Sequence, residues 1–194
     1  MLTNTDKTDV FPEMETDRLI STEIKTEYIP KIVEYASNKN ISAYTLNIPF
    51  PYNEKDAIYW INMAITGFKE RTNFIFAIRL KAENKFIGGI GLALEKKFSR
   101  AEIGYWIAEP FWNNGFASEA TNVIISFGFN ELGLNKITSS HFEVNPASGK
   151  VMIKCGLRQE GILKEHVCKN DVFHNLLVYG LTKTEFDKKK VDGF

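Results

Sequence analysis

The stretch that decides the fold of this chain reads Trp106-Ile107-Ala108-Glu109-Pro110-Phe111-Trp112-Asn113-Asn114-Gly115-Phe116-Ala117-Ser118-Glu119-Ala120. An apolar strand ends at a proline, and after Gly115 the apolar residues follow helical spacing. The turn between them supplies the first backbone N–H groups of that helix, which have no partner inside it. Together with the positive end of the helix dipole, these donors suit a phosphate or a pyrophosphate.

This turn lacks the cations of other phosphate-binding loops. No Lys or Arg occurs between Arg100 and Lys136, and the Gly-Lys-Ser/Thr signature of a P-loop is missing. Gly115 allows the backbone to approach a ligand closely, and the small side chains of Ala117 and Ser118 keep that approach open. We therefore expect anion binding here to depend on backbone dipoles.

Two motifs resemble one known family. Trp112-x-x-Gly115-x-Ala117 resembles the loop that holds the acyl-CoA pyrophosphate in the GNAT superfamily of N-acetyltransferases. Its aromatic first position is similar to the branch that contains the ribosomal-protein N-terminal acetyltransferases, where a glycine stands in place of Asn113. The second motif lies downstream and reads Asn145-x-x-Ser148-x-x-Val151-x-x-Lys154-x-Gly156-Leu157. With a Thr16-x-Arg18-Leu19 opening, the resemblance covers residues 15–182.

The resemblance implies acetyl-CoA as co-substrate, with no metal. It places the following residues around acetyl-CoA: Trp106, Ile107, Ala108, Trp112, Asn113, Asn114, Gly115, Phe116, Ala117, Ser118, Asn145 and Ser148.

Hydrophobic periodicity predicts a single α/β (α+β) domain. Helices are expected at 28–37, 54–71 and 146–154, and strands at 74–80, 86–92, 100–108, 136–144, 162–168 and 173–181. The glycines at 88, 89 and 91 lie inside a strand, which indicates close packing or a bulge and not a nucleotide loop. The resemblance implies the GNAT fold, a mixed central sheet splayed at the acyl-CoA site with helices on both faces. The expected boundaries are a loose polar arm at 1–14, one acetyltransferase domain at 15–184 and a basic tail at 185–194.

Composition narrows the class of protein. The 194 residues suffice for a hydrophobic core, and 24 Lys plus Arg against 24 Asp plus Glu create no global field for nucleic acid or an anionic membrane. Cys155 and Cys168 show no metal-ligand spacing, which suits a reducing compartment. The polar N-terminus and the lack of an apolar run of ~20 residues favour a cytoplasmic protein.

Asn145 and Ser148 are the candidates for the thioester side of the reaction. In relatives the Asn binds the pantetheine arm, and a Tyr seven residues later protonates the leaving thiolate. That position here is Met152, which has no proton to donate. In the ribosomal branch a Ser three residues after the Asn lies near the thiol, so the resemblance implies that Ser148 stabilises the leaving sulfur. Helix capping is the alternative role for both residues.

The general base stays open between three residues. Glu102 lies in an Ala-Glu-Ile-Gly-Tyr-Trp stretch that recurs in this branch. In the ribosomal branch a Glu after the short helix serves as base, and a gap-free register puts Val167 there, next to Glu165 and His166. A protein α-amine with a pKa near 8 needs only about 1.4 kcal/mol to deprotonate at pH 7, against roughly 4.6 kcal/mol for a lysine. A weak base therefore suffices for an N-terminal acceptor. Two further histidines, His141 and His174, are expected to be ordinary strand residues.

The amine acceptor is expected near the early helices and the 49–52 loop, because loops on rigid scaffolds carry specificity. Candidate wall residues are Tyr44, Phe50, Tyr52 and Trp60, although such aromatics also form cores. The predicted function is acetyl transfer from acetyl-CoA to a primary amine, either a protein N-terminus or a small molecule. The alternatives are a non-catalytic acyl-CoA-binding or sensing module and, more remotely, a nucleotide-binding protein. Assembly as a homodimer is left open.

Overall fold

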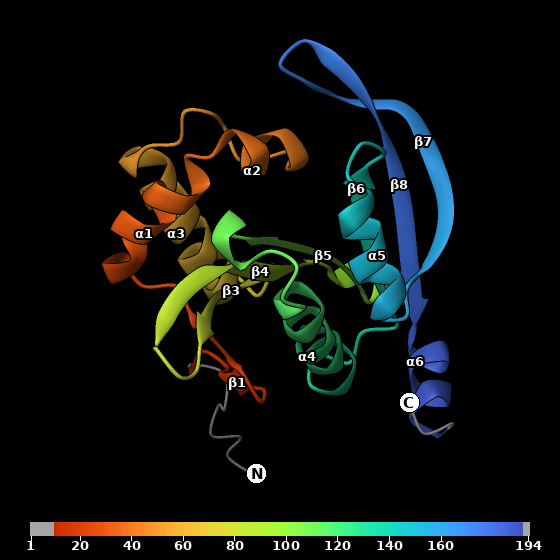
Figure 1. The fold of residues 1–194 in the computed structure, drawn as a ribbon. Helices are drawn as coiled ribbons and strands as arrows, with labels where there is room; N and C mark the ends of the chain where they lie inside the picture. Colours follow the sequence, from red (N-terminus) through yellow and green to blue (C-terminus); the bar gives the residue numbers. More distant parts are fainter. Residues whose placement is uncertain (1–9, 192–194) are drawn as a thin grey trace.

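A computed structural model describes residues 10–191 of the chain (Figure 1). The strands are β1 (Met14–Glu15), β2 (Leu19–Glu23), β3 (Asn73–Leu80), β4 (Lys85–Glu95), β5 (Arg100–Ile107), β6 (Lys136–Phe142), β7 (Arg158–Lys169) and β8 (Val172–Thr182). The helices are α1 (Ile29–Ala36), α2 (Lys39–Tyr44), α3 (Glu54–Lys69), α4 (Phe116–Asn130), α5 (Pro146–Lys154) and α6 (Lys183–Val191). Short 3₁₀ turns lie at Thr26–Tyr28, Lys96–Phe98 and Glu109–Phe111.

The described strands form one sheet in the order β1-β2-β3-β4-β5-β6-β8-β7. Neighbouring strands are antiparallel except β5 and β6, which run parallel and pair only at Arg100↔Lys136, Ala101↔Ile137 and Glu102↔Thr138. Beyond Glu102 the two strands separate. The predicted α/β fold with a mixed, splayed sheet is thus confirmed.

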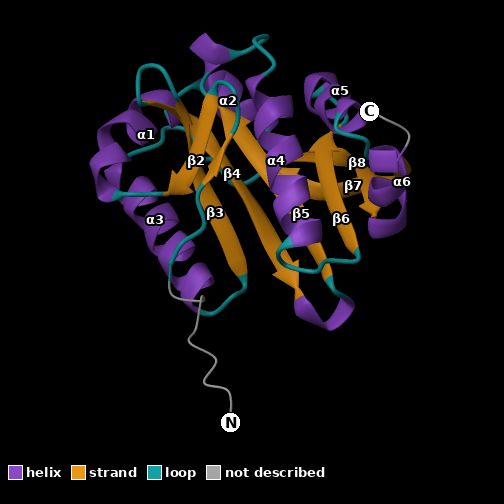
Figure 2. Cartoon of the chain, turned by 90° about the horizontal axis from the view of Figure 1, so that it is seen from below, coloured by secondary structure: helices purple, strands orange, loops and turns teal. Residues whose placement is uncertain are grey.

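Helices cover both faces of the sheet, as predicted (Figure 2). On one face, Ile103 and Ile137 are buried with Ile124 of α4. On the other face, Ala77 and Trp106 are buried with residues of α1, α2 and α3. The two apolar clusters hold β5 between them, so the strand that carries the candidate site is fixed from both sides.

The close packing expected of the β4 glycines is confirmed. A Cβ added to Gly88 would lie 2.2 Å from the carbonyl oxygen of Trp106 on β5, and one added to Gly89 would lie 2.5 Å from the Trp60 ring. A side chain at position 88 would thus collide with the end of β5, and one at position 89 with Trp60 of α3.

Three segments differ from the sequence-based expectation. Helix α2 was not predicted, because its six residues are too short to show helical periodicity. Of the expected arm at 1–14, residues 1–9 lie outside the described residues. The rest of the arm is not loose, because Phe11 packs on Phe68 and Phe76, with ring centroids 4.8 and 4.9 Å apart. The expected basic tail forms α6, whose Phe186 packs on Phe129 at 4.8 Å.

None of the helices within residues 10–191 is long and apolar enough to cross a membrane.

Candidate active site

The turn before α4 has the backbone that an anion-binding loop needs. Gly115 is the N-cap of α4 with φ +78°, and Asn113 has φ +62°. Asn is one of the few residues other than Gly that adopts this left-handed conformation readily, so Asn113 fits where relatives have glycine. The first bond inside the helix runs from the Glu119 N–H to the Gly115 carbonyl, at 3.0 Å. The N–H groups of residues 116–118 precede it and lie at the positive end of the helix dipole.

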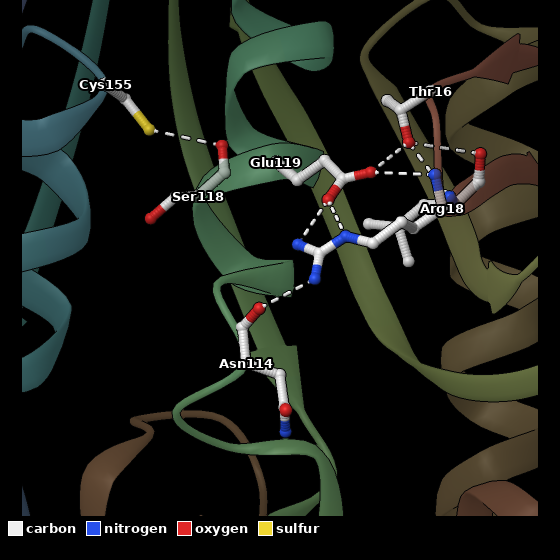
Figure 3. Close-up of polar contacts among 7 residues, drawn as sticks. Thr16, Arg18, Asn114, Ser118, Glu119 and Cys155 are labelled. Carbon is white, nitrogen blue, oxygen red and sulfur yellow. Dashed lines mark hydrogen bonds and ion pairs between the residues drawn. The ribbon is translucent and has the colours of Figure 1, made fainter.

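The loop is tied to the end of β5 by its own side chains. The Trp112 indole N–H donates to the Ile107 carbonyl at 2.6 Å, and the Asn114 amide donates to the Trp112 carbonyl at 2.9 Å. Ser118 is 7% exposed, and its carbonyl accepts from the Cys155 thiol at 3.4 Å (Figure 3), while its part in ligand binding stays a prediction. Burial raises the pKa of that thiol to about 12, so Cys155 is a packed donor and not a reactive thiolate.

Alternate residues of β5 turn their backbone groups toward the opening between β5 and β6. The Ile103 carbonyl accepts from the Ser139 hydroxyl of β6 at 2.9 Å, and the Ile107 carbonyl accepts from Trp112. The Ala108 N–H instead points to β4, where it donates to the Ile87 carbonyl at 2.8 Å. Because backbone groups of a strand alternate in direction, the N–H groups of residues 105 and 107 also face the opening.

Ser148 lies beside this opening and is held there by two residues. The Ser148 backbone N–H donates to the side-chain oxygen of Asn145, the N-cap of α5, at 3.3 Å. The Ser148 hydroxyl is 2.9 Å from the Tyr105 hydroxyl of β5. Burial raises the pKa of Tyr105 and outweighs the lowering by its bond to Ser148, so this phenol stays protonated. Met152 is buried in the core and does not face the site.

Tyr105 was missed by the sequence analysis. A signal was present, since Ala101, Ile103, Tyr105 and Ile107 alternate along β5 and belong to or pack against one apolar cluster. A tyrosine on such a face needs a partner for its hydroxyl. Which partner it finds depends on how α5 packs, and no local pattern shows that.

The three candidate bases are not brought together. Glu102 is exposed at the last paired position before the opening, where its carboxylate accepts from the Ser140 hydroxyl at 2.9 Å. Glu165 and His166 lie in an irregular part of β7, the edge strand, where Glu165 has φ +47° and its N–H donates to Asn175. Strands β8 and β6 separate β7 from β5 in the sheet. The roles of all three stay predictions.

Two histidines take the structural roles that were expected. His141 is buried and stacks on Tyr179, and His174 stacks on Phe142, with ring centroids 5.4 and 4.7 Å apart. Among the described residues no group of three or more His, Cys, Asp or Glu side chains is arranged to hold a metal ion.

The candidate acceptor residues divide into two kinds. Tyr44 and Phe50 are exposed. Tyr52 is 7% exposed, and burial raises its pKa to about 12, while Trp60 packs on Trp106 with ring centroids 6.0 Å apart. Tyr52 is a buried member of the apolar cluster that includes residues of α1–α3, and Trp60 is partly buried against it, while their role toward the acceptor stays a prediction.

A lysine missed by the sequence analysis joins the last hairpin to the loop after α2. The Lys169 ammonium donates to the carbonyl oxygens of Ser42 at 2.6 Å and Ile48 at 2.9 Å, and also to that of Thr45. Figure 1 shows the tip of the β7–β8 hairpin bending toward α2. Burial lowers the pKa of Lys169.

The sheet opens between two parallel strands, and a helix N-terminus follows the end of one of them, which is the arrangement that the resemblance to acyl-CoA-dependent transferases implied. Residues 18–158 match the family model described as the Acetyltransferase (GNAT) domain. The chain therefore belongs to the GNAT family of acetyltransferases, as the sequence motifs predicted.

Individual relatives agree with this assignment. The chain is 34% identical over 175 residues to the uncharacterized N-acetyltransferase YoaA of Bacillus subtilis (strain 168), covering 90% of this chain and 98% of the relative. Its fold is similar to a GNAT-family acetyltransferase from Bacillus anthracis, with a TM-score of 0.80, 24% identity and coverage of 90% and 100%. It is also similar in fold to RimL, a ribosomal L7/L12 α-N-protein acetyltransferase solved with coenzyme A, with a TM-score of 0.80, 15% identity and coverage of 88% and 98%.

Proposed function

We propose that this protein transfers the acetyl group of acetyl-CoA directly to a primary amine. The observation that carries the proposal is the order of groups along β5. Glu102 stands where β5 and β6 part, Tyr105 with Ser148 follows, and the loop bonded to Ile107 comes last. A base, a hydroxyl for the sulfur and an anion-binding turn thus follow one another along a single strand.

The residues of this chain fit acetyl-CoA as co-substrate. The N–H groups of residues 116–118 suit its pyrophosphate, and the opening after Glu102 leaves the edge of β5 free for its pantetheine arm. Asn145 caps α5 and would also hydrogen-bond the amides of that arm. The bound thioester supplies an activated acetyl carbonyl. RimL, which is similar in fold, was solved in complex with coenzyme A, and this supports the same ligand here.

The chain's own groups then act at two atoms. The N–H groups of residues 105 and 107 polarise the thioester oxygen as the amine attacks, because fixed dipoles aimed at a developing charge stabilise it without reorganisation. The Ser148 hydroxyl donates a hydrogen bond to the departing sulfur. Tyr105 orients that hydroxyl, since the two oxygens are already 2.9 Å apart.

Glu102 is our candidate for the base that takes the amine proton, directly or through water. It is exposed, and it lies at the point where the opening begins. Side chains of adjacent strand residues point to opposite faces, so Glu102 lies on the face opposite Tyr105 and Ser148. The amine adds to the acetyl carbonyl to give a tetrahedral intermediate, Glu102 takes its proton, and the C–S bond breaks as the carbonyl re-forms, with the sulfur leaving toward Ser148. Glu165 and His166 are the second choice.

The acceptor is a protein N-terminus or a small amine, with Tyr44 and Phe50 as its contacts. The test is to incubate the protein with isotopically labelled acetyl-CoA and a dialysed cell extract, with and without added small metabolites, and to locate the label by mass spectrometry. Label on protein N-termini identifies a ribosomal-type modifying enzyme, and label on metabolites identifies a small-amine acetyltransferase. No label despite measured acetyl-CoA binding would contradict the proposal and favour an acyl-CoA sensor.

A homodimer through the sheet edge is a further part of this proposal. The outer side of β7 is an unpaired edge of 12 residues that exposes Ile162 and Leu163. Sedimentation equilibrium of the wild type and of a variant with Lys at both positions would test it, because the charges should lower the mass from dimer to monomer.

A further inference from the structure

The Thr16-Asp17-Arg18-Leu19 opening has no part in the function proposed so far. The structure places it against the first turn of α4, 101 residues away in the sequence (Figure 3). We call the contact of Thr16 and Arg18 with Glu119 the Arg18 clamp.

The clamp surrounds the Glu119 carboxylate with donors. One oxygen accepts from the Thr16 hydroxyl at 2.5 Å and from the Arg18 backbone N–H at 3.1 Å. The other accepts from the Arg18 side chain, from Nε at 2.7 Å and from Nη2 at 2.6 Å. Two bonds from one guanidinium that converge on a single oxygen fix its plane as well as its position, which a lysine cannot do.

The same guanidinium also holds the anion-binding loop itself. Its remaining nitrogen, Nη1, donates to the Asn114 carbonyl at 3.1 Å. Its carbon lies 4.6 Å from the centre of the Phe116 ring, and a Cβ added to Gly115 would be 3.6 Å from Nη2. Arg18 thus contacts the residues on both sides of Gly115, where the backbone turns into the helix.

The negative charge of Glu119 needs a compensating cation beside the anion-binding loop. Glu119 lies in the first turn of α4, next to the N–H groups that would receive a pyrophosphate. An uncompensated carboxylate there would repel the ligand. The Glu119 side chain is 18% exposed, so water screens its charge only in part. Arg18 supplies the cation that the sequence between Arg100 and Lys136 lacks.

We propose that Arg18 is a positioning residue for coenzyme A binding, which holds loop 112–118 in its anion-binding shape and cancels the charge of Glu119. The inference rests on the proposed function in one respect, that this loop receives the CoA pyrophosphate. The two parts of this proposal predict different effects of E119Q on the affinity for coenzyme A. If Arg18 acts through the shape of the loop, R18M and E119Q should each lower that affinity. If it acts by cancelling charge, R18M should lower the affinity and E119Q should raise it.

The test is calorimetric titration of coenzyme A into the variants R18M, E119Q and R18M/E119Q. R18M should lower the affinity at least tenfold, and adding E119Q to it should restore at least threefold, because the repelling carboxylate is gone. K81M is the matched control, since it removes the exposed Lys81–Glu15 ion pair of the same region and should leave the affinity unchanged.

Hydrogen exchange in ligand-free protein tests whether Arg18 holds the shape of the loop, independently of whether the loop binds coenzyme A. The Glu119 amide, which donates to the Gly115 carbonyl at 3.0 Å, should exchange at least tenfold faster in R18M than in wild type or K81M. Wild-type affinity in R18M would overturn the role of Arg18. No recovery in the double variant would overturn the charge part, and unchanged exchange in R18M would overturn the shape part. A wild-type protein that binds no coenzyme A would overturn the proposed function, while the exchange result would still report on the clamp. R18K, which keeps the charge but not the paired bonds, should lie between R18M and wild type.

Discussion

Replacement of Tyr105 by Phe removes one hydroxyl and leaves the ring that packs in the core. Two contacts are lost: the 3.2 Å bond that the Tyr105 hydroxyl donates to the Ser148 carbonyl, and the 2.9 Å contact with the Ser148 hydroxyl, which is neutral on both sides and worth about 1 kcal/mol. If this bond orients Ser148 toward the sulfur, that energy is lost from the transition state. Since 1.36 kcal/mol is tenfold in rate, kcat should fall about fivefold.

Ser148→Ala should cost more, because it removes the donor to a developing negative charge. A hydrogen bond to a charged group is worth about 1.5–3 kcal/mol, so kcat should fall about 10- to 100-fold. In S148A there is no Ser148 hydroxyl left for Tyr105 to orient, and the 3.2 Å bond to the backbone carbonyl of residue 148 does not reach the sulfur, so kcat of the Y105F/S148A double variant should be close to that of S148A. The expected coupling between the two sites is therefore about 1 kcal/mol.

The assay is release of the CoA thiol with the acceptor found by labelling, together with the coenzyme A dissociation constant and the melting temperature of each variant. Tyr59, which is 70% exposed on α3, provides the matched control, and Y59F should behave as wild type. Losses that multiply in the double variant would refute the reasoning, since Tyr105 would then act independently of Ser148. An unchanged kcat in Y105F would refute it as well.

Three further predictions concern stability and pH. Gly88→Ala should lower the free energy of unfolding by about 3 kcal/mol or more, roughly 6–12 °C in Tm, because its Cβ would meet the Trp106 carbonyl at 2.2 Å. Gly104→Ala on β5 is the control and should be near neutral, because its Cβ meets nothing within 4 Å. Thr121→Val should stabilise by about 1 kcal/mol, because the buried Thr121 hydroxyl has no hydrogen-bond partner among the described residues; a lower Tm would contradict this. For Glu119, burial acts to raise the pKa, but its bonds to residues 16 and 18 prevail and lower it. Its contribution is therefore present above the unfolded pKa of about 4.3 and lost as the pH falls through the lower folded value, so the gap in Tm between wild type and E119Q should close in acid and stay closed.

Local patterns predicted much of the fold and the first half of the site. The proline after β5 and the glycine before α4 set the strand, the turn and the helix within a few residues, and these are short-range effects of backbone geometry. The alternation along β5 also determines which side chains are buried. That is why the element order and the anion-binding turn follow from the sequence.

The contacts that complete the site join distant residues, and no local pattern contains them. Arg18 reaches Glu119 across 101 residues, and Tyr105 reaches Ser148 across 43. The absence of Lys and Arg near the turn suggested that backbone dipoles alone would serve, yet folding brings a cation there from the segment that leads into β2. The aromatic residues Tyr52 and Trp60 were ambiguous for the same reason, because only packing decides whether a ring fills a core or lines a surface.

The lysine at the end of β7 has a consequence for how the chain matures. Lys169 binds carbonyl groups that were synthesised 121 to 127 residues earlier. At ribosomal rates of about 5–20 residues per second, the loop after α2 waits roughly 6 to 25 seconds for its anchor. During that time the 42–48 segment has only local bonds, such as that from the Ser42 hydroxyl to the Ile48 carbonyl, and lacks its anchor on the last hairpin. The surface expected to meet the acceptor is therefore completed only when the final hairpin leaves the ribosome, so a truncated chain lacks it even where its earlier parts have folded.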